Sequence, residues 1–156
     1  MTDAKADSAN LILKLYELRR EETMREARNW FARFDPQSAQ DVVAAMVDEK
    51  TSAYYRMVAS YWDMASSFVN HGAIDEALFN DANMEHVFVF SKFEPHLAEL
   101  RTTFNAPGML ANLEKLVMRQ PDAQAKLEAM RARSRAMAQR RAEARDSAAH
   151  ADAANA

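Results

Sequence analysis

Residues 51–72, TSAYYRMVASYWDMASSFVNHG, form the most regular apolar pattern of the chain and decide its fold. Large apolar side chains recur here at i, i+3, i+4 and i+7, which is the spacing of one broad face of an α-helix. Thr51 or Ser52 can cap the start of this helix, and Gly72 stands where a left-handed residue would end it. The pattern predicts a central helix with neighbours on more than one side. Its apolar face consists of Tyr54, Met57, Val58, Tyr61, Trp62, Ala65, Phe68 and Val69.

The remaining face of this helix is small and polar, and its side chains fall within an arc of roughly 80°. One interpretation is a pocket for a small ligand between this helix and the first helix, where residues 19–26 carry both arginines and glutamates. The other is an internal network of ion pairs, or a face in contact with water. The second interpretation describes the more common use of such side chains. The candidate polar strip consists of Arg56, Ser60, Asp63, Ser67 and Asn70.

Composition favours an all-α fold. The 156 residues include two glycines and four prolines, fewer turn formers than a sheet with tight hairpins requires. The absence of cysteine excludes disulfides, thiolate nucleophiles and cysteine-ligated metals. No apolar run approaches the ~18 residues of a membrane span, and the polar start, MTDAKADSAN, does not resemble a signal peptide. We therefore expect a cytoplasmic protein.

Periodicity and breakers predict an antiparallel helical bundle of about five main helices, with a basic helix at its C-terminal end. Asp35-Pro36 is expected to end the first helix and start the second. Pro95 is expected to interrupt a later helix near residues 92–94. The expected organisation is a disordered leader at 1–9, a bundle domain at 10–119, an Ala/Arg-rich helix at 120–146 and a disordered tail at 147–156. The expected helices are 10–34, 37–49, 51–72, 76–79, 83–104 (interrupted at Pro95), 109–119 and 121–145.

The segment HVFVFSKF, residues 86–93, is rich in β-branched and aromatic side chains and competes as a buried strand. A strand needs a partner, and the rest of the chain contains no second strand-like run. We therefore interpret the segment as helical.

No arrangement of residues indicates catalysis or metal binding, so we expect no catalytic residue, metal or cofactor. None of the four histidines follows a glutamate at three positions, and none belongs to an HExxH motif. The acidic segment IDEALFNDANMEH lacks the glycine and the alternating oxygen ligands of a calcium loop. Ser67 and His71 lie one helical turn apart, but a serine within a helix has no oxyanion hole around it. Helix capping accounts for most of these polar side chains.

The last helix is basic, whereas the rest of the chain is acidic. Residues 1–118 contain 12 Lys/Arg and 18 Asp/Glu, and residues 119–156 contain 8 and 5. Nucleic-acid binding needs such a basic face, but no aromatic side chain is interleaved for base stacking. The alternative is a half-docked helix that pairs with a second copy through its apolar seam. The candidate interaction helix comprises Leu127, Met130, Arg131, Arg135, Met137, Arg141 and Arg145.

Three segments resemble a family of small all-helical bacterial domains of unknown function, some of which carry an N-terminal membrane helix. They are LYELRREETMREARNWF, YYRMVASYWDMASSFVNHGAIDEALF and the helix that ends in FEPHLAELR. The resemblance covers residues 11–104. It implies a helical fold and transfers no site residue, because the family has no assigned activity.

The residues favour a non-enzymatic interaction or scaffolding module, as a homodimer or with a protein partner. Exposed aromatic side chains such as Tyr55, or the C-terminal seam, would be its contact surface. A small-ligand sensor that uses Arg56 and Asp63 is the first alternative. A nucleic-acid-associated protein that uses the arginine helix is the second.

Overall fold

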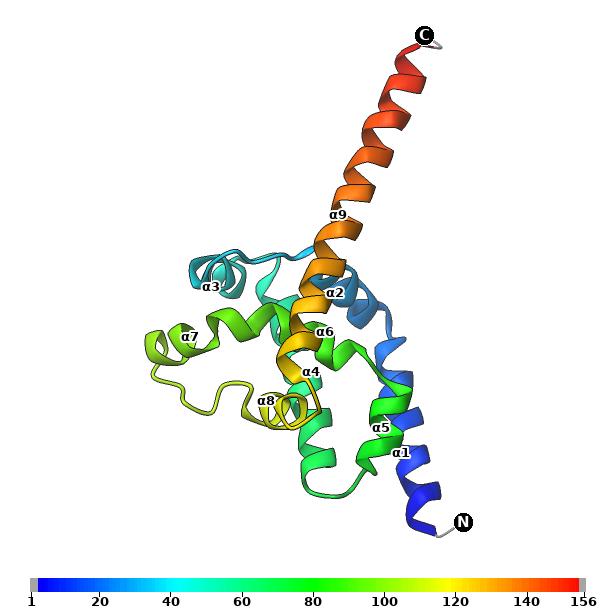
Figure 1. Cartoon of the computed structure of the whole chain (residues 1–156), viewed down its shortest axis with the longest axis vertical. Coiled ribbons are helices and arrows are strands. Elements are labelled where there is room, and N and C mark those ends of the chain that lie inside the picture. Colours follow the sequence, from blue (N-terminus) through cyan, green and yellow to red (C-terminus); the bar gives the residue numbers. More distant parts are fainter. Residues whose placement is uncertain (1–2, 155–156) are drawn as a thin grey trace.

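The computed structural model describes residues 3–154, and this part of the chain is all-helical, without a strand (Figure 1). Residues 86–93 are helical, so the interpretation of that segment is confirmed. No helix in the described range is both long and apolar enough to cross a membrane. The elements are α1 (Asp3–Arg19), α2 (Glu22–Arg33), α3 (Ala39–Val47), α4 (Ser52–Asn70), α5 (Glu76–Ala82), α6 (Glu85–Phe93), the 3-10 helix η1 (Glu94–His96), α7 (Leu97–Thr103), α8 (Ala111–Met118) and α9 (Ala123–Ala154).

The predicted central helix is confirmed as α4, which packs against α2, α3, α6 and α8. Val58, Trp62 and Ala65 lose essentially all contact with water. Gly72 ends the helical segment with a φ of 75°, as its position predicted. Tyr55 was expected to be exposed, and that expectation is wrong. Its ring is buried and meets the Phe93 ring edge-on at 5.7 Å between centroids.

The N-terminal part differs from the expectation in two ways. First, α1 begins at Asp3, where a disordered leader was expected; residues 1–2 lie outside the described range. Ser8 is buried and its hydroxyl accepts a hydrogen bond from the Asp75 backbone N–H at 3.0 Å, which fixes this segment against the start of α5. Second, the single helix expected over 10–34 is broken between α1 and α2. The Glu21 carboxylate accepts hydrogen bonds from the backbone N–H groups of Thr23 and Met24 and so begins a new helix.

Capping decides two further boundaries. The N-cap of α3 is Ser38 rather than Asp35, because Ser38 and Asp41 form a reciprocal capping box. α5 starts at Asp75 as expected, with the carboxylate accepting from the Leu78 N–H at 2.8 Å. Pro95 interrupts its helix as expected, but the interruption takes the form of the 3-10 helix η1 between α6 and α7.

α9 extends far beyond the rest of the molecule (Figure 1). Its first turns pack on α6 and α8, where Leu127 is fully buried. It then continues past Arg145 to Ala154, through most of the stretch where a disordered tail was expected; residues 155–156 lie outside the described range. Alanine and arginine have high helix propensity, which explains why the helix persists without packing partners.

Candidate functional site: a groove beside the C-terminal helix

Two members of the candidate polar strip hold α8 in place. Asp63 accepts hydrogen bonds from the backbone N–H groups of Asn112 and Leu113, both at 3.0 Å, and from the Asn112 side-chain amide at 3.2 Å. The residue before α8, Leu110, has a φ of 54° and offers no side-chain cap of its own. Asp63 therefore acts as the N-cap of α8 from a distant part of the chain. Asn70 adds a second link by donating to the Asn112 carbonyl at 3.0 Å.

The other three members of the strip lie apart from these two contacts. Arg56 is exposed, and the hydroxyls of Ser60 and Ser67 donate to carbonyls of their own helix, those of Arg56 and Met64. Ser60 also lines a shallow hollow between α4 and the junction of α1 and α2. Asp63 and Asn70 thus form hydrogen bonds with α8, where the network interpretation expected ion pairs, and Arg56 and Ser60 lie on an exposed face.

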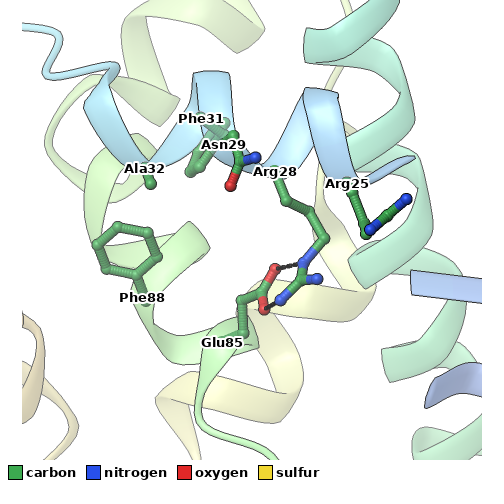
Figure 2. A pocket seen from close by; sticks show the side chains of 7 residues that line it. All are labelled: Arg25, Arg28, Asn29, Phe31, Ala32, Glu85 and Phe88. Carbon is green, nitrogen blue, oxygen red and sulfur yellow. Dashed lines mark hydrogen bonds and ion pairs between the residues drawn. The ribbon is translucent and has the colours of Figure 1, made fainter. Parts of the chain in front are cut away.

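Sequence reasoning missed the main ion-pair network, which joins α2 to the start of α6. Arg28 binds Glu85 through two parallel hydrogen bonds, Nε to Oε1 at 2.8 Å and Nη2 to Oε2 at 2.6 Å (Figure 2). These bonds raise the pKa of Arg28. Arg19 of α1 approaches the same carboxylate at 3.4 Å, and Arg28 also donates to the Arg19 carbonyl. The network thus fixes the break between α1 and α2 against α6.

A buried lysine holds the other end of α2. Lys92 of α6 is 5% exposed, and its ammonium group donates to the backbone carbonyls of Phe31, Ala32 and Phe34. Burial lowers the pKa of Lys92 to about 8, whereas the three carbonyl dipoles favour its charged form. All three ammonium hydrogens are engaged, so Lys92 is a structural cap for the C-terminal end of α2.

Beside this junction, α2, α6 and α9 enclose a groove made of three adjoining hollows. The first, of about 320 Å³, lies around Arg28 and Phe88 (Figure 2). The other two, of about 140 and 510 Å³, follow α9 toward its projecting part. Ala32 lines all three hollows, so they adjoin one another and are described together as one groove. We call it the α2–α9 groove, and its floor is formed by Ala32, Phe88, Met130 and Met137.

The rim of the α2–α9 groove is strongly basic. Five exposed arginines line it, and none of them pairs with a carboxylate among the described residues. The acidic side chain that lines the groove is Glu85, which is already bound to Arg28. The groove therefore combines an apolar floor with unneutralised positive charge. The five rim arginines are Arg25, Arg33, Arg133, Arg141 and Arg145.

The histidines do not gather. His86 is buried against the rings of Trp62 and Phe79, and its Nε2 lies 3.2 Å from the Asn80 side-chain oxygen. Burial lowers the pKa of His86 to about 4, so its ring is neutral at physiological pH. Within residues 3–154, no group of three or more His, Asp or Glu side chains is arranged to hold a metal ion.

A comparison with known protein families shows which family the chain belongs to. A family model described as a domain of unknown function, DUF4760, matches residues 5–120. The chain belongs to the DUF4760 family. The resemblance expected over residues 11–104 is thereby confirmed, with a somewhat wider extent. Comparisons with curated proteins and with solved structures find no match.

The DUF4760 match covers α1 to α8 almost completely and stops before α9. One wall of the α2–α9 groove, formed by α2 and α6, therefore lies within the DUF4760 domain. The other wall is formed by α9, which follows the matched region. The groove thus lies between the family domain and the segment that follows it, and each of them supplies one wall.

The structure divides the residues predicted for the interaction helix among three locations. Leu127 is buried in the core, while Met130 and Met137 line the floor of the α2–α9 groove. Arg141 and Arg145 lie on its rim. The remaining two residues face another side, where Arg131 pairs with Glu94 at 3.1 Å and Arg135 lines a separate small hollow beside Lys92.

Proposed function

We propose that this DUF4760 protein is a non-enzymatic interaction module whose contact surface is the α2–α9 groove with the projecting part of α9. One observation carries the proposal: five unpaired arginines surround an apolar floor at the base of a helix that extends away from the molecule. Exposed arginines beside accessible apolar side chains are typical of protein contact surfaces. We further propose that the protein works in the bacterial cytoplasm and that residues 10–119 form one antiparallel bundle that presents α9 at its edge.

The use of the other polar side chains supports a non-enzymatic role. Asp63 and Lys92 cap helices, and Arg28 and Glu85 join α2 to α6. The charges of Asp63 and Lys92 are engaged by backbone groups, and those of Arg28 and Glu85, which line the groove, are engaged by each other, so these four side chains are already occupied within the fold. Such contacts hold the groove in a fixed shape, as a scaffold requires.

Self-association is a second part of the proposal, and its best support lies on another surface. A shallow apolar hollow of about 470 Å³ runs between α4 and the junction of α1 and α2, with Leu18 54% and Met64 40% exposed beside it. A face with two exposed large apolar side chains fits a symmetric contact between two copies. Analytical ultracentrifugation tests this: a dimer should dissociate in Leu18→Glu, and a monomer at all concentrations would contradict a homodimer.

Recovery of the protein from its own cells tests the main proposal. The tagged chain is cross-linked, isolated and compared with an Arg141→Glu/Arg145→Glu variant. An Arg56→Glu variant serves as a control, because Arg56 is an exposed arginine outside the α2–α9 groove. A defined protein partner should accompany the wild type and the control and be lost from the double variant. Identical recovery with all three proteins would contradict the proposal.

The arginines of α9 also support nucleic-acid association as a second candidate function. Phosphate contacts would make such binding fall steeply with salt, and Arg141 and Arg145 would contribute to it. Retention of nucleic acid by the wild type, lost in Arg141→Glu/Arg145→Glu, would favour this candidate. The small-ligand sensor around Arg56 and Asp63 has less support, because Asp63 already binds α8.

A further inference from the structure

We propose that the α2–α9 groove binds an amphipathic helix of a partner protein, a helix with an apolar face and flanking aspartates or glutamates. This inference rests on the proposed function and specifies the chemistry of the partner. Three features of the groove carry it: its floor, its two-sided rim and its position between α2 and α9.

The floor suits an apolar helix face. Phe88 and Met130 are half-buried, and Met137 is 45% exposed, so each side chain still has apolar surface to bury. Methionine is unbranched and adapts to the shape of an incoming side chain. Apolar residues at i, i+3 or i+4, and i+7 of a partner helix would meet this floor in the usual helix-in-groove arrangement.

The rim presents positive charge on both sides of this floor. Arg25 and Arg33 lie eight residues apart on α2, or about 12 Å along the helix axis. Arg133 and Arg145 lie twelve residues apart on α9, or about 18 Å, with Arg141 between them. A partner helix of about two to three turns spans these distances. Carboxylates on both flanks of its apolar face would therefore find arginines on both walls.

The arginine rim and the apolar floor together favour an acidic amphipathic helix over a second copy of this chain and over nucleic acid. In a symmetric contact, a second copy of this chain would bring its own α9 arginines to the same groove, and like charges repel. Nucleic acid would be attracted by the arginines, but its phosphates gain nothing from a floor of methionine and phenylalanine. An acidic amphipathic helix satisfies both parts of the groove at once.

Selection from a display library of random peptides of about 18 residues, which span about 27 Å as helices, tests the inference. The full chain is the target. The enriched peptides are synthesised with a fluorophore, and their dissociation constants are measured by anisotropy. We expect enriched peptides with helical apolar spacing and a net negative charge. Raising sodium chloride from about 50 to about 500 mM should weaken their binding about tenfold or more.

Variants locate the binding on the groove. Arg33→Gln/Arg141→Gln removes one charge from each wall and should weaken binding about tenfold or more. Met137→Gln removes an apolar contact at a half-exposed position, where folding is expected to persist, and should weaken binding about threefold or more. Arg56→Gln, the charge-matched control outside the groove, should change the dissociation constant by less than about twofold.

Several outcomes would overturn the inference. Enriched peptides without acidic residues, or no enrichment of groove-dependent peptides, would exclude an acidic helix as the occupant. Binding of a 20-base-pair DNA or a single-stranded RNA that depends on Arg141 but not on Met137 would assign the groove to nucleic acid. Dimerisation that is lost in Met137→Gln would assign it to a second copy. If the cellular partner depends on Arg141 and Arg145 but the peptides do not, the proposed function stands and this inference fails.

Discussion

Replacement of Asp63 by alanine tests whether this carboxylate is a structural cap or a group reserved for a ligand. In the structure it accepts three hydrogen bonds from α8, two of them from backbone N–H groups at 3.0 Å. Loss of an N-cap costs about 0.5–2 kcal/mol, and hydrogen bonds to a charged acceptor contribute about 1.5–3 kcal/mol each. Asp63 is only half-buried, so water will replace part of these bonds. We therefore expect Asp63→Ala to lower the free energy of unfolding by about 2–3 kcal/mol.

Urea unfolding followed by the fluorescence of the tryptophans, of which Trp62 is fully buried, measures this loss. Asp63→Asn is the matched control, because it keeps one acceptor oxygen for the two backbone N–H groups and should lose about half as much. A change below about 0.5 kcal/mol in Asp63→Ala would refute the capping argument. It would also strengthen the ligand-sensor alternative, since groups held ready for a ligand are commonly removed without loss of stability.

Three other perturbations give further tests. His86 has a pKa lowered by burial to about 4, below its unfolded value of about 6.5, so the unfolded state binds more protons between these pH values. The free energy of unfolding, measured by urea titration, should therefore be highest above pH 6.5 and decrease by about 2–3 kcal/mol by pH 4.5. His86→Gln should reduce this dependence on pH. Equal pH dependence in the two proteins would contradict a lowered pKa of His86. Glu85→Gln should lower the free energy of unfolding by about 2 kcal/mol. A double-mutant cycle with Arg28→Gln should give a coupling energy above about 1 kcal/mol, whereas additive effects of the two substitutions would mean that the ion pair does not stabilise the fold. Gly72→Ala should lower the free energy of unfolding by about 1 kcal/mol, because Gly72 has a positive φ. Gly108 has equally open surroundings, but its φ is not in the left-handed region. Thermal unfolding should therefore show that Gly108→Ala is nearly neutral.

The parts of the fold that could be predicted from the sequence are those with strong local signals. The α4 stripe, the Gly72 terminus and the Asp75 cap all depend on residues within a few positions of one another. The break before α2 escaped prediction because its capping residue, Glu21, is not among the common N-caps. The start of α3 was misplaced because Asp35-Pro36 and Ser38 are rival caps three residues apart, and local sequence does not rank them.

The parts that escaped prediction depend on long-range contacts. Residues 3–9 are polar enough to suggest disorder, and the hydrogen bond from Asp75 to Ser8, which holds them against α5, joins residues 67 positions apart. The pairing of Arg28 with Glu85 joins residues 57 positions apart. The α2–α9 groove likewise appears only when Phe88 and Met137 are brought together in space. The arginines of α9 and the seam that includes Met130 and Met137 were recognised as a candidate surface, but the other part of the apolar floor, Ala32 and Phe88, and the second wall of arginines on α2 were not.

The central claim is that the α2–α9 groove is where this DUF4760 protein meets its partner. The most direct test places a photo-reactive benzophenone amino acid at position 137, on the groove floor, in the full chain within its own cells. The control position is 47, which is 71% exposed on α3. Irradiation should produce an adduct at position 137 with an acidic segment of another protein, and none at position 47. Adducts that form at position 47 and not at position 137 would contradict the claim.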